Sequence, residues 1–269
     1  MRLLVIGAAG FIGSNLTRHA AAQGLDVVAL ARSGRVAGFS GPCLRWSLGQ
    51  PLPAKALEGV TCAIHLVHDF DGENGARLTA EQTTACVARL REAGVLRQLF
   101  FSSYSAGAHA TSLYGRTKFA IERALAGAAD VVIVRPGLVL GDGGIYGRIR
   151  KWAQNFSLVP LPDGGRLAVP VIDVERLSRE TILLAEISGG HDDANLFEPE
   201  LVSLRELVLR AAAEVHRRPL IVPIPSLFLL SGLRAAALLR IPLPVNADNL
   251  SGLLANQSAG HASTLHRRL

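Results

Sequence analysis

The chain has 269 residues, of which 49% are hydrophobic and 19% charged, and its formal net charge is +6. This length predicts one large domain, or one domain with a small appendage, and the composition is that of a globular protein. No run of 18 apolar residues occurs, so no membrane span is expected, and the absence of basic runs with interleaved aromatics argues against nucleic-acid binding.

The first 140 residues alternate between short apolar runs and helical patterns. Strands buried on both faces are predicted at 3–7, 27–30, 63–67, 99–103 and 131–136, with a weaker candidate near 44–46. Helices are predicted over roughly 11–23, 77–93 and 115–127. Such alternation predicts an α/β fold with a Rossmann-like, doubly wound parallel sheet. We assign it to residues 1–145, with 166–190 returning to it.

Residues 146–269 are predicted to form a small, mostly helical C-terminal substrate-binding cap. Helices are expected near 146–156 and 173–187, with a Pro/Gly loop at 160–165, and Asp248 or Asn249 could cap the last helix. The apolar stretch 226–241 could cover a substrate pocket, contact a second subunit or lie on a membrane surface.

A glycine triplet follows the first predicted strand. Gly7 permits a tight turn, Gly10 lets the backbone approach a pyrophosphate, and Gly13 lets helix and strand pack closely. The following helix offers free N–H groups to phosphates. The sequence therefore predicts a dinucleotide site at Gly7, Ala9, Gly10, Phe11, Ile12 and Gly13.

Arginines stand where the second predicted strand ends. An acidic residue there would bind the ribose hydroxyls of NAD, but this chain has Arg32 and Arg35 and no carboxylate. Because a guanidinium can pair with a 2′-phosphate, NADP is favoured over NAD. The alternative is that both are ordinary loop arginines.

Tyr114 and Lys118 lie four residues apart on a predicted helix, where they would share one face. Spacing alone does not separate a catalytic pair from two residues on a common face. In order along the chain, however, GAAGFIG (7–13), FFSS (100–103), YGRTK (114–118) and VRPGLVLG (134–141) resemble the extended short-chain dehydrogenase/reductase superfamily. The likeness is to its NAD(P)-dependent epimerase/dehydratase branch and to smaller, atypical relatives, and it covers about residues 1–175.

The resemblance implies a catalytic Ser103, Tyr114 and Lys118. Tyr114 would exchange a proton with the substrate oxygen, and Lys118 would favour its phenolate and bind the nicotinamide ribose. Ser103 would orient the substrate oxygen, with Ser105 as the second candidate. The resemblance further places Ser102, Leu66, Val67, Pro136, Gly137, Leu138 and Val139 beside the cofactor.

Two departures from the family pattern affect the site. Ser47 and Leu48 stand where the family has an Asp-Leu pair that contacts adenine. The stretch from Ser103 to Ser112 is short, which leaves the substrate class open. His68, Asp69 and His109 are the remaining polar candidates, of which His68, Asp69 and Ser105 are the predicted substrate contacts.

The resemblance implies an NAD(P)-dependent oxidoreductase or epimerase that acts on a hydroxyl or carbonyl carbon of a sugar-nucleotide-like or other polar metabolite. The alternative is a non-catalytic NADP-binding sensor or scaffold of the same fold. No metal site is predicted, since the histidines show no ligand spacing with carboxylates. Three scattered cysteines favour a reducing compartment, and we expect a cytoplasmic protein. A homodimer across 77–93 and 114–127 is a further expectation from the resemblance.

Overall fold

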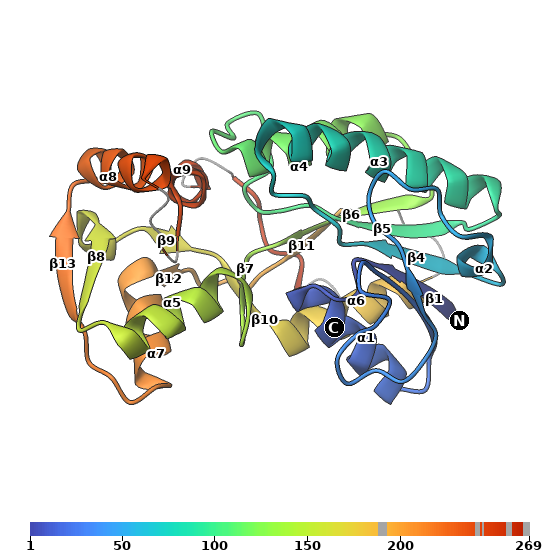
Figure 1. The fold of residues 1–269 in the computed structure, drawn as a ribbon, viewed down its shortest axis with the longest axis horizontal. Helices are drawn as coiled ribbons and strands as arrows, with labels where there is room; N and C mark the ends of the chain where they lie inside the picture. The colour runs from blue at the N-terminus through green and yellow to red at the C-terminus, as the bar shows by residue number, and fades with distance from the viewer. Residues whose placement is uncertain (188–192, 240–242, 244, 257–259, 266–269) are drawn as a thin grey trace.

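A parallel sheet of seven strands forms the centre of the computed structural model, which describes residues 1–187, 193–239, 243, 245–256 and 260–265 (Figure 1). Its order is β3-β2-β1-β4-β5-β6-β11, and every pairing is parallel. The chain reverses its direction of winding between β1 and β4, the place where doubly wound sheets bind ligands. The strands are β1 (Arg2–Ile6), β2 (Asp26–Ala31), β3 (Cys43–Arg45), β4 (Cys62–His65), β5 (Arg97–Phe101), β6 (Val131–Pro136) and β11 (Ala194–Leu196). The predicted fold class is confirmed.

Helices cover both faces of this sheet. α1 (Phe11–Ala22) and α6 (Val174–Glu186) pack side by side on one face, and α3 (Gly72–Glu92) and α4 (Leu113–Leu125) on the other (Figure 1). Because side chains alternate along a strand, Leu3 of β1 packs under α1 while Leu4 packs under α3. A four-residue helix, α2 (Ala54–Leu57), packs through Ala56 on the same face of the sheet as α3.

A second lobe packs around its own apolar core, which contains Tyr146, Val169 and Leu207. Its helices are α5 (Gly144–Asn155), α7 (Leu204–Ala213), α8 (Ser226–Leu238) and α9 (Ala247–Ala255), with a 3-10 turn, η1 (Asp163–Gly165). Its strand pairs are β7 (Leu138–Leu140) with β10 (Val171–Asp173), β9 (Ala168–Val169) with β12 (Val202–Ser203), and β8 (Leu158–Pro162) with β13 (Leu220–Ile224).

Two expectations about chain segments were wrong. All of the predicted loop 160–165 belongs to β8 and η1, and β8 pairs in parallel with β13 despite its prolines. A two-stranded sheet tolerates proline because each strand has a free edge, where a missing N–H costs nothing. α3 begins at Gly72 rather than near residue 77, because its first turn contains Gly72 and Gly75, two residues that favour a loop locally.

None of the described helices is both long and apolar enough to cross a bilayer. The apolar stretch predicted at 226–241 forms α8 as far as Leu238, and residues 240 and 241 lie outside the described part of the chain. α8 packs on α9 and β8 through Leu233, whereas Leu227 and Phe228 are exposed.

Candidate active site

The glycine loop joins β1 to α1, and two of its three glycines, Gly7 and Gly13, leave no room for a side chain. A Cβ on Gly13 would lie 2.3 Å from the Gly7 carbonyl oxygen, and Gly7 itself has a φ of +93°. Gly10 is the N-cap of α1 and no side chain caps this helix, so the N–H groups of its first turn are available to an anion. These residues fit the pyrophosphate of a dinucleotide.

Several other predicted cofactor residues surround this loop. A Cβ on Gly7 would lie 3.0 Å from Val67 Cγ2, and Leu66 also follows β4 directly, so both border the loop. Phe11 begins α1 and packs against Gly143, on which a Cβ would lie 2.5 Å from its ring. The glycine-rich segment 141–144 therefore closes over the start of α1. Ala9 is exposed and Ile12 packs on the core.

The turn after β6 brings the two lobes together. A Cβ on Gly137 would lie 2.6 Å from the Pro170 carbonyl oxygen, and Leu138 donates its backbone N–H to the same oxygen at 2.8 Å. Pro136 accepts a backbone hydrogen bond from Tyr104 at 3.1 Å. Pro136, Gly137, Leu138 and Val139 thus connect the end of β6 to β7. Their contact with a nicotinamide stays a prediction.

A hollow of about 400 Å³ lies where β2 and β3 end. It is lined by Arg32, Arg45, Trp46, Ser47 and Gln50. Leu48 packs instead on the core beneath. Arg45 was not predicted as a site residue, because a three-residue strand gives little sequence signal; its side chain joins that of Arg32 only in the fold.

Tyr114 and Lys118 lie on the first two turns of α4. Ser112 caps the helix by accepting from Gly115 N at 3.0 Å, and a Cβ on Gly115 would lie 2.6 Å from the Ser105 carbonyl oxygen. Lys118 is 2% exposed, and its Nζ donates to the Phe101 carbonyl oxygen at 2.8 Å. The helix therefore holds this pair against the end of β5.

Burial dominates the electrostatics of the pair. It raises the pKa of Tyr114 to about 12 and lowers the pKa of Lys118 to about 7. Nζ of Lys118 lies 5.7 Å from the centroid of the Tyr114 ring. At neutral pH Tyr114 therefore carries its proton in this environment, and only nearby positive charge would lower its pKa.

The three serines after β5 are oriented differently. Ser103 Oγ lies 2.9 Å from Ser105 Oγ and accepts from Ser105 N at 3.2 Å, so one turn holds both hydroxyls. Ser102 is 2% exposed and donates to Glu122. Of the three, only Ser103 and Ser105 are partly accessible, and both stay predicted substrate contacts.

An aromatic cluster borders Tyr114. The His68 ring meets Tyr114 edge-on at 4.8 Å and Phe70 at 4.6 Å. Burial lowers the pKa of His68 to about 3, so the ring is neutral, and its buried Nδ1 has no hydrogen-bond partner among the residues that the structure describes. Phe70, which sequence reasoning missed, is 78% exposed. The Asp69 carboxylate accepts from Asp71 N at 3.0 Å and so shapes the loop before α3.

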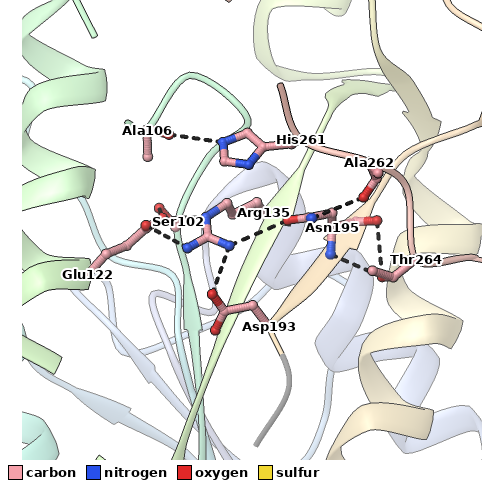
Figure 2. A network of polar contacts seen from close by, with 9 residues as sticks. All are labelled: Ser102, Ala106, Glu122, Arg135, Asp193, Asn195, His261, Ala262 and Thr264. Carbon is pink, nitrogen blue, oxygen red and sulfur yellow. Dashed lines mark hydrogen bonds and ion pairs between the residues drawn. The ribbon is translucent and has the colours of Figure 1, made fainter. Parts of the chain in front are cut away.

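The loop after β5 is supported by the C-terminal segment 260–265 (Figure 2). His261 Nε2 lies 3.0 Å from the Ala106 carbonyl oxygen, and its ring meets Tyr104 edge-on. Thr264 exchanges hydrogen bonds with Asn195 of β11. His109 lies within this short loop, and its buried Nε2 has no hydrogen-bond partner in the described part of the chain.

The N-terminus of α4 is capped from the far end of the chain. Asp248 on α9 accepts from Leu113 N at 2.6 Å and Tyr114 N at 3.3 Å. α9 itself is capped by Asn246, whose side chain forms a capping box with Asn249. Of the two residues expected to cap this helix, Asn249 does so as part of the capping box, whereas the carboxylate of Asp248 caps α4 instead.

Replacing Asp248 with alanine should destabilise the protein by about 1 kcal/mol, the usual cost of a lost helix cap. Urea denaturation followed by circular dichroism measures this. Asp248→Asn is the matched control, since it keeps one acceptor oxygen and should lose less. Equal stability of Asp248→Ala and the wild type would contradict a capping role.

Comparison with known proteins agrees with this geometry. The sequence profile of the NAD dependent epimerase/dehydratase family matches residues 3–158. MoeE5, solved in complex with UDP-glucose and NAD, is 25% identical with a TM-score of 0.68, covering 84% of this chain and 85% of that one. The UDP-glucose 4-epimerase of Thermus thermophilus, solved in complex with NAD, is 18% identical with a TM-score of 0.66, covering 97% and 100%.

A third solved structure, the NAD-dependent NDP-hexosamine 5,6-dehydratase TunA, is 16% identical with a TM-score of 0.69, covering 96% and 98%. No curated protein matches the chain in sequence. The profile match spans more than half of the chain and includes the glycine loop, Tyr114 and Lys118. The chain therefore belongs to the NAD-dependent epimerase/dehydratase family of enzymes.

Proposed function

We propose that the protein is an NAD(P)-dependent enzyme that oxidises, reduces or epimerises a hydroxyl-bearing carbon of a nucleotide-linked sugar or a similar polar metabolite. The observation that carries this is the placement of Lys118 and Tyr114 at the carboxyl end of β5. The glycine loop lies at the same end of the sheet, where β1 ends. Support for the substrate class comes from MoeE5, whose structure contains UDP-glucose and NAD.

The chain's own residues divide the chemistry. A bound nicotinamide supplies hydride exchange with the substrate carbon. Tyr114 gives a proton to the substrate oxygen or takes one from it, and the positive charges of Lys118 and of a bound oxidised nicotinamide would together favour its phenolate form. Ser103, with Ser105 beside it, orients the same oxygen.

Cofactor binding and turnover are measured separately to test this. NADPH and NADH are titrated by fluorescence, and the enzyme is then assayed against nucleotide sugars and carbonyl compounds. Turnover of a nucleotide sugar supports the proposal. Tight cofactor binding without turnover of any compound in the panel contradicts the proposal. It favours the alternative, a non-catalytic NADP-binding sensor or scaffold.

We further propose that NADP is the preferred cofactor. Arg32 and Arg45 line the hollow at the ends of β2 and β3, and within the described part of the chain neither has a carboxylate partner. Two guanidinium groups suit a 2′-phosphate, which accepts charge-assisted hydrogen bonds. In the same hollow, Ser47 offers a hydroxyl to the adenosine.

Arg45→Ala should weaken NADPH binding about tenfold or more, since a hydrogen bond to a charged group contributes about 1.5–3 kcal/mol. The NADH affinity should change less than about twofold. Arg35→Ala, an exposed arginine outside the lining of the hollow, is the matched control. If both cofactors lose affinity equally, Arg45 does not bind the 2′-phosphate.

The homodimer and the cytoplasmic location of the protein stay predictions.

A further inference from the structure

A buried carboxylate lies one turn beyond Lys118 on α4. Glu122 is 7% exposed and Lys118 is 2% exposed. Lys118 binds the carbonyl oxygen of Phe101, and Glu122 accepts from the hydroxyl of the next residue, Ser102 (Figure 2). The two opposite charges therefore hold consecutive residues of the segment that leads to Ser103.

Arg135 fixes the carboxylate from the neighbouring strand. Its Nε lies 2.9 Å from Glu122 Oε1 and its Nη2 lies 2.7 Å from Oε2, a bidentate pair. Arg135 also pairs with Asp193 at 2.9 Å (Figure 2). This bidentate clamp compensates the charge of a carboxylate that the fold buries.

Glu122 acts electrostatically on Lys118. Burial lowers the pKa of Lys118 to about 7, and the negative charge of Glu122 opposes this by raising it. The other titratable groups that face Lys118 are Tyr114 on its own helix, His65 at the end of β4 and His68 just after that strand. Burial holds the pKa of His65 at about 4 and that of His68 at about 3, so neither histidine is charged near neutral pH.

Glu122 in turn faces Arg135, Ser102 and His261, the last carried by the C-terminal segment. Burial lowers the pKa of His261, so this ring brings no positive charge near neutral pH. Arg135 is consequently the permanent cation at Glu122. Its guanidinium is shared between Glu122 and Asp193.

We propose that Glu122 is a positioning residue for the acid–base pair, and that its clamped carboxylate keeps Lys118 protonated and bound to the end of β5. The inference rests on the proposed function of Tyr114 and Lys118.

The chain has three lysines, Lys55, Lys118 and Lys151, which makes a direct test available. In protein labelled with ¹³C at lysine Cε, each side chain titrates as a separate NMR signal. In Glu122→Gln the midpoint of Lys118 should fall by about one pH unit or more, because the opposing charge is gone. The exposed Lys55 and Lys151 should not move. An exposed replacement, Glu81→Gln, is the matched control and should leave all three midpoints unchanged.

Activity should follow the same sign. Since the proton on Lys118 is lost as pH rises through its midpoint, the alkaline fall in kcat should move to lower pH in Glu122→Gln. Glu122→Asp keeps the negative charge but places it farther from Lys118, so the midpoint of Lys118 should fall by less. This variant replaces Glu122→Gln in the test if the glutamine variant does not fold. An unmoved Lys118 midpoint in the folded variant overturns the inference. A shifted midpoint in a protein without turnover supports it and counts against the proposed function instead.

Discussion

Replacing Tyr114 with phenylalanine is expected to lower kcat by about 10²–10⁴-fold, the range that a positioned general acid or base contributes. The change removes one oxygen and leaves the ring that packs on His68 in place. The glycine loop and the hollow around Arg45 lie on other strands, so NADPH affinity should stay within about threefold of the wild type. Steady-state kinetics and fluorescence titration measure the two quantities separately.

Tyr104→Phe is the matched control for this change. Tyr104 is a buried tyrosine on the loop after β5, held between Phe197 and His261. It lies ten residues before Tyr114 in the sequence. Removing its hydroxyl should leave kcat within about threefold of the wild-type value. Retained activity in Tyr114→Phe would show that another group moves the proton, and would overturn the assignment.

The parts of the site that the sequence predicted are those coded by local signals. β1, the glycine loop and α1 follow one another within 22 residues, and each has its own pattern of apolar residues or glycines. The same holds for Tyr114 and Lys118, since an i, i+4 pair on a helix shares a face wherever the helix lies. Such features need no knowledge of the rest of the fold.

The parts that the sequence did not predict depend on contacts between distant segments. Arg45 meets Arg32 only because β3 pairs with β2, and Asp248 reaches Tyr114 across 134 residues. The clamp on Glu122 joins α4 to β6, and β6 to the segment before β11. The β8 and β13 pair was missed for the opposite reason: its prolines are a strong local signal for loops, which pairing in the second lobe overrides.

Replacing Gly13 with alanine is expected to cost about 3 kcal/mol of folding stability, at the upper end for an overpacked site. The new Cβ would lie 2.3 Å from the Gly7 carbonyl oxygen and 2.9 Å from Ala8 Cα. Both atoms are backbone, so neither can turn aside as a side chain would. For a chain of this size, the melting temperature should fall by roughly 6–12 °C.

Gly10→Ala separates packing from binding at the same loop. Its φ is −70°, and its Cβ would lie 3.3 Å from the Gly7 oxygen, a contact that a shift of a few tenths of an ångström relieves. We therefore expect near wild-type stability but at least tenfold weaker NADPH binding, because the methyl group occupies the face that a pyrophosphate approaches. Thermal denaturation and fluorescence titration of both variants measure the contrast. The loop would not be the rigid phosphate-binding loop that its geometry indicates if Gly13→Ala had the melting temperature of the wild type. The same would follow if Gly10→Ala bound NADPH with wild-type affinity.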